Sequence, residues 1–385
     1  MNISPDTRRD LECIASSCPR QWLYQLGDEG VVYSEARNRF AGLDAAGVSA
    51  YLAFDAGAQI EDLKRIRDAH EPDAASGGLE TIHALAHGIF PNDEPADEFF
   101  EDWPAPSTYP GTANIEVHGI PISLAYPTGP LQERCLDCFK NYAPSDKPAR
   151  WRLSAQPTGN GWAIYINDRK FFSLQDEQQL GLGLMHAARA LLYAKGKYDV
   201  AFHAATVAFG NRGIMLCAPR ECGKSTLAAY LVACGGDLLA DEPSLLHLEA
   251  WSVSPLHMPI SLKEGSWPIL QQHWPQLACT PVHVRSDGVK IRMAHPSRCS
   301  PRSRRLTHIV FPRYAPSSSA EAESLSPLHT LRLLSEGGML LAKQFARENF
   351  EALLRSIWQT PAYRLPYATL EEAHRMLHEI GCLEK

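Results

Sequence analysis

The chain has no long apolar run, no excess of basic residues and no regular cysteine spacing, and each absence excludes a class of protein. No stretch of its 385 residues approaches the ~20 consecutive apolar residues that a helix needs to cross a bilayer. The formal net charge of -7 argues against a general nucleic-acid binder, which needs a basic surface. The N-terminal residues lack the apolar core of a signal peptide, so we expect a cytoplasmic protein that binds neither membranes nor nucleic acid.

The cysteines also fail to form a recognisable framework. There are 10 of them, scattered along the chain, and without an export signal they are expected to be reduced thiols. Cys135 and Cys138 form a Cys-x-x-Cys pair, but no second pair completes the ligands of a structural zinc site. The pattern therefore favours two small apolar side chains on a helix that begins near Leu131.

The first region of the sequence, residues 1–72, has the texture of a small α+β domain. Short strand patterns at Gln21–Leu26 and Gly30–Ser34 alternate with helical patterns at 44–54 and 60–69. A chain of this length is expected to hold more than one domain. We therefore predict that this region folds as a unit of its own.

The rest of the chain divides into a linker and a larger domain. Residues 73–111 are acidic and interrupted by proline, which predicts a linker. Residues 112–385 predict an α/β domain, in which Ile115–Ala125 is a strand pattern and Trp162–Phe172 is two strands joined by a turn. Asp176–Ala194 has the apolar periodicity of a helix that starts with two acidic residues.

The most informative segment is a predicted strand at Ile214–Cys217 followed by a loop that ends Gly223-Lys224-Ser225-Thr226 and opens a helix. Strand, loop and helix in this order are typical of a P-loop, whose backbone N–H groups and helix N-terminus bind phosphates. Lys224 would bind the β- and γ-phosphates of ATP, and the hydroxyl of Ser225 would ligate Mg²⁺. The predicted cofactor-binding residues are Ala218, Pro219, Arg220, Glu221, Cys222, Gly223, Lys224, Ser225 and Thr226.

This loop departs from the usual P-loop pattern. Ala218 stands where the pattern has glycine, and it fits only if its φ angle is negative. Glu221 would place a negative charge beside the phosphates unless Arg220 or Mg²⁺ offsets it. The alternative is a helix N-terminus that carries Gly-Lys-Ser by coincidence, which the strand-loop-helix context disfavours.

Two carboxylates follow the next predicted strand, Leu238–Ala240. In a nucleotide-binding core this strand normally lies beside the P-loop strand, so its carboxyl end would deliver Asp241 and Glu242 to the phosphates. One carboxylate could accept a proton from an attacking hydroxyl while the other orients Mg²⁺ or water. The alternative is that the pair ends the strand and meets solvent. A single histidine on a strand, such as His203, is usually structural.

Two segments and the loop between them together resemble the catalytic domain of HPr kinase/phosphorylase. The segments are Phe202-His-Ala-Ala-Thr-Val-Ala-Phe-Gly-Asn-Arg-Gly-Ile-Met-Leu and Gly235-Gly-Asp-Leu-Leu-Ala-Asp-Glu. The resemblance covers roughly residues 112–380 and implies that His203 lies near the γ-phosphate and that Asp241 is the catalytic base. Glu242 stands where that family often has a second Asp, as a metal ligand with Ser225.

The same resemblance implies further properties. The signature by which HPr kinases handle their protein substrate is absent, so HPr is not the expected acceptor. Lys263 and Arg313 are candidates to bind phosphates, although each is as well explained as a surface or ion-paired cation. HPr kinases are assemblies, and the resemblance extends the expectation of a homo-oligomer to this chain.

The N-terminal region, at Tyr33–Leu52 and Ala58–Leu63, resembles PqqD-like domains, which are winged-helix units that bind the leader segments of ribosomally made peptides. The alternative is a generic α/β cap. The predicted fold is thus α/β, a P-loop HPr-kinase-like core with a small α+β winged-helix-like domain.

The predicted function is an ATP- and Mg²⁺-dependent kinase that uses Asp241, His203 and Lys224. The phosphate would pass to a serine-type hydroxyl of a peptide, protein or small molecule. The alternatives are a module in which ATP hydrolysis gates peptide binding, and a degenerate scaffold that binds nucleotide weakly or not at all.

Overall fold

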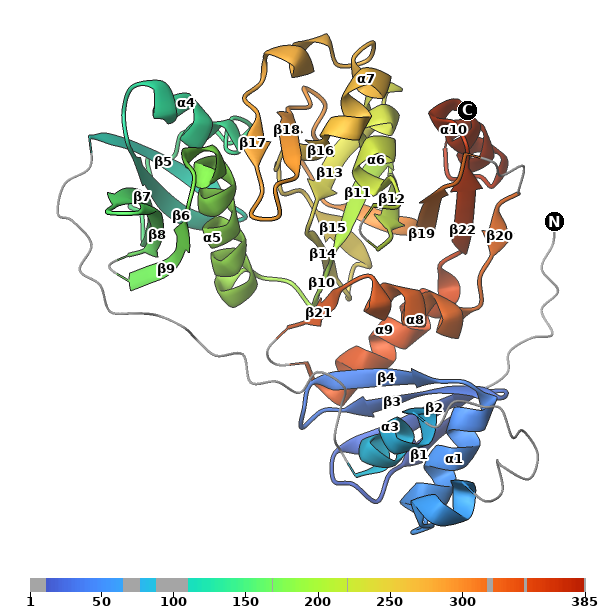
Figure 1. Cartoon of the computed structure of the whole chain (residues 1–385). Coiled ribbons are helices and arrows are strands. Elements are labelled where there is room, and N and C mark those ends of the chain that lie inside the picture. The colour runs from blue at the N-terminus through green and yellow to red at the C-terminus, as the bar shows by residue number, and fades with distance from the viewer. Residues whose placement is uncertain are drawn as a thin grey trace. The chain divides into compact units, whose positions relative to one another are not determined.

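A computed structural model describes residues 12–64, 77–87, 110–167, 169–219, 221–316, 321–342 and 345–383. The chain is mixed α/β and divides into two compact units (Figure 1). The first unit consists of residues 1–96, 325–336 and 341–359, and the second of residues 97–324, 337–340 and 360–385. No helix among the described residues is long and apolar enough to cross a membrane.

The first unit is built on a four-stranded antiparallel sheet in the order β1-β2-β3-β4. Side chains alternate across it: Leu23 and Val32 pack with the buried face of α1, whereas Tyr33 stacks on Phe350 of α9 with ring centroids 4.2 Å apart. Both faces are therefore apolar and covered. The elements are β1 (Glu12–Ala15), β2 (Gln21–Leu26), β3 (Glu29–Ser34), β4 (Arg39–Leu43), α1 (Ala45–Asp55), α3 (Gly77–Ala86), α8 (Pro327–Glu336) and α9 (Arg347–Gln359).

The bounds of this unit differ from the predicted ones. The described part of the predicted 73–111 linker holds α3, whose Leu85 and Ala86 are buried in the core of the first unit. Helices α8 and α9 belong to the same unit, although they lie some 300 residues away in sequence, in the predicted 112–385 domain. Local apolar patterns do not encode which distant face a helix will cover. Of the predicted helix at 60–69, residues 60–64 are helical and the remainder lies outside the described residues.

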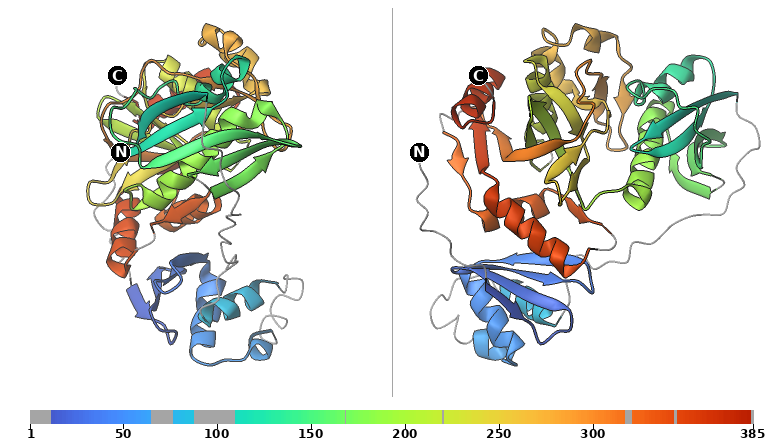
Figure 2. Two further views of the ribbon diagram at one scale, coloured as in Figure 1. Left: turned by 90° about the vertical axis from the view of Figure 1, so that its left-hand side faces the viewer. Right: turned by 180° about the vertical axis from the view of Figure 1, so that it is seen from behind.

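The second unit begins with a five-stranded sheet in the order β5-β6-β7-β8-β9, against which α5 packs (Figure 2). The single strand predicted at Ile115–Ala125 is instead a hairpin. His118 and Gly119 have φ angles of 50° and 78°, as a two-residue hairpin turn requires, so the chain reverses there. The elements are β5 (Gly111–Val117), β6 (Ile120–Tyr126), α4 (Pro130–Asp137), β7 (Trp151–Thr158), β8 (Gly161–Ile166), β9 (Arg169–Leu174), the 3-10 turn η1 (Glu177–Gln179) and α5 (Leu180–Lys195).

The largest sheet of the second unit has the order β13-β11-β12-β19-β15-β14-β10-β21, with β22 and β20 beyond β19. The prediction that β13 lies beside β12 is wrong, because the β11–β12 hairpin inserts β11 between them. Since β11 is antiparallel to both, β12 and β13 still run in the same direction. The elements are β10 (Val200–Phe202), β11 (Ala204–Phe209), β12 (Arg212–Cys217), α6 (Lys224–Ala233), β13 (Asp237–Asp241), β14 (Ser244–His247), β15 (Ser252–Ser254), β19 (Arg304–Tyr314), β20 (Glu323–Ser324), β21 (Met339–Leu341), β22 (Ala362–Tyr367) and α10 (Leu370–Glu379).

A three-stranded sheet, β16-β18-β17, joins the two larger sheets of the second unit. One continuous core contains Leu184 of α5, Ala240 of β13 and Met293 of β18, so the three sheets are packed together. The remaining elements are β16 (Ile260–Lys263), η2 (Glu264–Ser266), α7 (Trp267–Leu270), η3 (Pro275–Cys279), β17 (His283–Val284) and β18 (Lys290–Ala294).

A buried carboxylate fastens α4 to the three-stranded sheet. The fully buried side chain of Asp137 accepts hydrogen bonds from His283 Nε2 at 2.9 Å and His295 Nε2 at 3.1 Å, and pairs with Lys140 Nζ at 2.8 Å. Burial by itself would raise the pKa of Asp137, but the hydrogen bonds from these three residues outweigh it and hold the pKa well below its usual range. Cys135 and Cys138, beside it, are buried free thiols, as predicted.

We predict that Asp137→Ala destabilises the protein by about 3–5 kcal/mol, because it leaves the buried ring of His283 and the largely buried ring of His295 without their acceptor. Urea unfolding measures the loss. Because the folded-state pKa is depressed, the carboxylate stabilises the fold above the ordinary pKa of about 4, and this contribution is lost as the pH falls below it.

Glu133→Gln is the matched control for Asp137→Ala, since its side chain lies on the same helix and is 67% exposed. It should change stability by less than about 0.5 kcal/mol. Equal effects of the two substitutions would show that the buried carboxylate contributes nothing particular to the fold.

Candidate functional site

The segment from β12 to α6 is a strand, a loop and a helix, as the sequence predicts. Gly223 has a φ angle of 86° and its carbonyl accepts the N–H of Leu227 at 2.9 Å, which starts α6. A Cβ at this position would collide with the hydroxyl of Tyr367, from the end of β22. Both the backbone angle and the close approach therefore require glycine.

The unusual residues of the loop are accommodated individually. Ala218 is buried and is not among the described residues with positive φ. It therefore meets the requirement for a negative φ angle that an alanine has at this position. Glu221 has the strained φ angle of 72° instead, and its carboxylate pairs with Lys263 Nζ at 3.1 Å. The predicted partner Arg220 lies outside the described residues. Lys263, on β16, thus supplies the neutralising charge.

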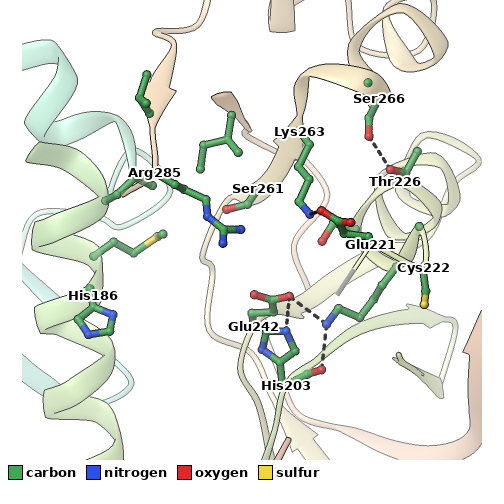
Figure 3. Close-up of a pocket in the computed structure, with 18 of the residues that line it drawn as sticks. His186, His203, Glu221, Cys222, Thr226, Glu242, Ser261, Lys263, Ser266 and Arg285 are labelled. Carbon is green, nitrogen blue, oxygen red and sulfur yellow. Dashed lines mark hydrogen bonds and ion pairs between the residues drawn. The ribbon is translucent and has the colours of Figure 1, made fainter. Parts of the chain in front are cut away.

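Lys224 is the centre of a small polar network (Figure 3). Its Nζ lies 2.9 Å from Glu242 Oε1 and donates to the backbone carbonyl of His203, also at 2.9 Å. The Nε2 of His203 lies 3.1 Å from the same carboxylate oxygen. The side chain of Lys224 is only 5% exposed, so these partners hold a nearly buried ammonium group.

The peptide linkage between β10 and β11 positions His203. The chain leaves β10 at Phe202 and enters β11 at Ala204, and the N–H of His203 donates to Gly338 O at 2.8 Å. The break in the ladder turns the carbonyl of His203 toward Lys224, and its ring faces Glu242 (Figure 3). The structure thus brings His203 into contact with two other predicted site residues, Lys224 and Glu242.

Asp241 lies behind this network, 2% exposed, at the end of β13. Its Oδ1 accepts the hydroxyl of Ser225 at 3.1 Å and its Oδ2 accepts the N–H of Ser261 at 3.1 Å. The carboxylates of Asp241 and Glu242 thus reach Ser225 and Lys224 respectively. The alternative in which the pair merely meets solvent is excluded for Asp241, which is buried.

The two neighbouring carboxylates have different acidities. Burial, reinforced by the charge of Glu242, raises the pKa of Asp241 to about 6. Burial would also raise the pKa of Glu242, but the charges of Lys224 and His203 outweigh it and lower the pKa below its ordinary value. Glu242 therefore holds its negative charge more readily than Asp241 does.

These residues border a pocket of about 1590 Å³ in the second unit. Its lining includes all of the predicted loop residues from Pro219 to Thr226 that the structure describes, together with His203 and Glu242, and Asp241 lies beneath Ser225. Arg313 does not line the pocket and is exposed, so the structure gives no support to its predicted role.

Some pocket residues were not predicted to belong to a site. Tyr314 and Tyr367 flank Gly223, and Ser266 Oγ lies 2.7 Å from Thr226 Oγ1. They come from β19, β22 and η2, far from the loop in sequence, so no local pattern links them to it.

The oxygen donors near Ser225 suit a magnesium ion. The described residues contain no group of three or more His, Cys, Asp or Glu side chains that could hold a metal by themselves. Mg²⁺ is usually held by one or two protein oxygens together with the phosphates of a nucleotide. The hydroxyl of Ser225 and the carboxylates of Asp241 and Glu242 are donors of that kind.

Comparison with known proteins adds no assignment. The sequence matches no family model. It also matches no curated protein. A function for this chain must therefore be argued from the geometry of the site.

We predict that Gly223→Ala destabilises the protein more than Gly235→Ala, a matched control. Gly235 also has positive φ, at 103°, but a Cβ there would meet nothing within 4 Å. The control should lose about 1–2 kcal/mol from backbone strain. Gly223→Ala should lose about 1–3 kcal/mol more from the collision with Tyr367. Equal losses, measured by urea unfolding, would contradict the close approach of Tyr367.

Proposed function

We propose that the protein is an ATP-dependent kinase that transfers the γ-phosphate to a hydroxyl group. The observation that carries this proposal is the convergence of Lys224, Ser225 and two carboxylates of different acidity at the start of α6. The N-terminus of a helix and the N–H groups of the preceding loop favour phosphate oxygens. Lys224 adds a positive charge in a place that is largely closed to water.

In this proposal the 218–226 loop acts as a P-loop. Lys224 is already oriented by Glu242 and by the carbonyl of His203, so its ammonium group needs little reorganisation to meet a phosphate. Ser225 and Glu242 would hold the magnesium ion, which in such sites neutralises phosphate charge when bound. The pairing of Glu221 with Lys263 offsets the negative charge that Glu221 would place beside the phosphates.

Asp241 is the proposed general base. A carboxylate with a pKa of about 6 is largely ionised at neutral pH, yet it is a stronger base than an ordinary aspartate. Its Oδ1 accepts from the hydroxyl of Ser225, at the phosphate end of the pocket, and its Oδ2 accepts from the N–H of Ser261. His203 and Glu242 would orient Lys224 and stabilise the charge that develops on the transferred phosphoryl group.

The main alternative is a module that hydrolyses ATP to gate a partner. Asp241 would then activate water instead of an acceptor hydroxyl. The pocket of about 1590 Å³ has room for an acceptor beside a nucleotide, which supports the kinase. The likeness of the N-terminal region to PqqD-like domains, and a peptide acceptor held there, stay predictions.

We predict that Mg-ATP raises the thermal unfolding midpoint and that Lys224→Ala removes most of this shift. A ligand at about 100 times its dissociation constant stabilises the native state by about 2.7 kcal/mol. Lys147→Ala is the control, because it removes a lysine whose side chain is 64% exposed. An unchanged shift in Lys224→Ala, with the variant folded, would place the nucleotide elsewhere.

We predict that Asp241→Asn retains nucleotide binding and loses phosphoryl transfer by about 10²–10⁴-fold, because it removes the base. In the unmodified protein, the transfer rate should fall toward acidic pH, as Asp241 takes up a proton and can no longer act as a base. This measurement uses the transfer rate under saturating nucleotide.

Asp237→Asn is the matched control for Asp241→Asn, since Asp237 lies at the other end of β13 and pairs with Arg298 at 3.0 Å. It should leave the rate and the pH profile unchanged. Transfer by Asp241→Asn within a few-fold of the original rate would assign the base to Glu242 or His203.

A further inference from the structure

One side of helix α5 forms a wall of the pocket. Five residues of this helix line the cavity: Leu182, Met185, His186, Arg189 and Tyr193. Except for the adjacent pair Met185 and His186, they follow one another at intervals of three or four residues, as residues on one side of a helix do. The opposite stripe of the helix is buried in the core of the second unit, which fixes the orientation of this wall. The helix contains no Asp or Glu.

The rest of this wall is aromatic and basic. His186 stacks on Phe171 of β9 with ring centroids 5.6 Å apart, and Phe172 packs edge-on against the same ring. Arg285, which follows β17, points into the pocket on the same side as His186 (Figure 3). It also donates to Asp287 at 2.7 Å, a residue that does not line the cavity. Lys263 and Glu221 lie across the cavity (Figure 3).

Arg189 lines the pocket from α5, and its charge acts on both carboxylates of the site. Its Nε is buried and has no hydrogen-bond partner among the described residues, although buried polar atoms usually have one. Burial acts to raise the pKa of both Asp241 and Glu242. The positive charge of Arg189 acts to lower the pKa of both groups. The guanidinium is therefore within electrostatic range of the proposed reaction centre, with unused hydrogen-bonding capacity.

The distribution of charge separates two halves of the cavity. The acidic lining residues are Glu221, Glu242 and Glu371, which come from the loop, the end of β13 and the start of α10. The α5 wall carries no acidic residue. A nucleotide bound at Lys224 would leave the α5 half open. Guanidinium groups recognise carboxylates and phosphates by paired hydrogen bonds.

We propose that the α5 wall is the acceptor site, and that the acceptor is a small hydroxylated molecule carrying a carboxylate or phosphate, which Arg189 and Arg285 bind. This inference rests on the proposed kinase function and adds the chemical class of its substrate. The hydroxyl of the acceptor points toward Ser225, beneath which Asp241 lies, while its apolar part contacts Met185 and Phe171. In the transfer, the acceptor oxygen forms a bond to the γ-phosphorus, the bond to ADP breaks, and the hydroxyl proton passes to Asp241.

The test uses the full chain saturated with a non-hydrolysable ATP analogue and measures binding from the shift in thermal midpoint. The probes are phenyllactate, glycerate and glycerol 3-phosphate, compared with the neutral molecules phenyllactamide, glyceramide and glycerol. At least one anionic probe should bind at least tenfold more tightly than its neutral counterpart. The carboxylate and phosphate probes distinguish the two sources of negative charge.

Arg189→Gln should weaken binding of that probe at least tenfold and leave the shift caused by the ATP analogue unchanged. Lys195→Gln is the control, because Lys195 is an exposed cation on the same helix that does not line the pocket. Equal binding of anionic and neutral probes, no binding of any anionic probe, or an unaltered affinity in Arg189→Gln would overturn the acceptor site. If the ATP analogue caused no shift in the thermal midpoint of the unmodified protein, the nucleotide site would be overturned instead. The shift caused by the analogue and the shift caused by the probes are separate measurements, so the two failures can be told apart.

Discussion

The ion pair between Lys224 and Glu242 is the constraint on which the arrangement of the site depends. A nearly buried ammonium group is costly unless charged and polar partners surround it, and here a carboxylate and a backbone carbonyl are both 2.9 Å away. To supply them, the end of β13, the break between β10 and β11 and the start of α6 must meet at one point. The same requirement brings His203 and Asp241 to the loop, because each adjoins a partner of Lys224 in sequence or space.

The β11–β12 hairpin makes this meeting possible. With β11 between them and antiparallel to both, β12 and β13 end at the same edge of the sheet. The loop after β12 and the carboxylates after β13 therefore face each other across the width of one strand. The α5 wall forms another side of the cavity and does not belong to this sheet. The core that α5 shares with β13 and β18 fixes the position of this wall relative to the loop.

Local features of the fold could be predicted from the sequence, and strand neighbours could not. The strand, the Gly223 turn and α6 follow from residues adjacent in the chain, and so does the Asp176 cap before α5. The position of β13 was predicted wrongly because strand pairing depends on the whole sheet. The partner of Glu221 was missed because Lys263 lies 42 residues away, and the pocket side of α5 was missed because apolar periodicity reveals only the buried stripe.

The most direct test of the proposed kinase is the fate of the γ-phosphate. ATP labelled at that position is incubated with the protein, Mg²⁺ and a pool of small metabolites, and the label is separated into inorganic phosphate and organic phosphate esters. The account predicts that label accumulates in an acid-stable ester that a phosphatase cleaves. Label found only in inorganic phosphate would contradict the account and favour an ATP-hydrolysing module, and label that stays in ATP would contradict both.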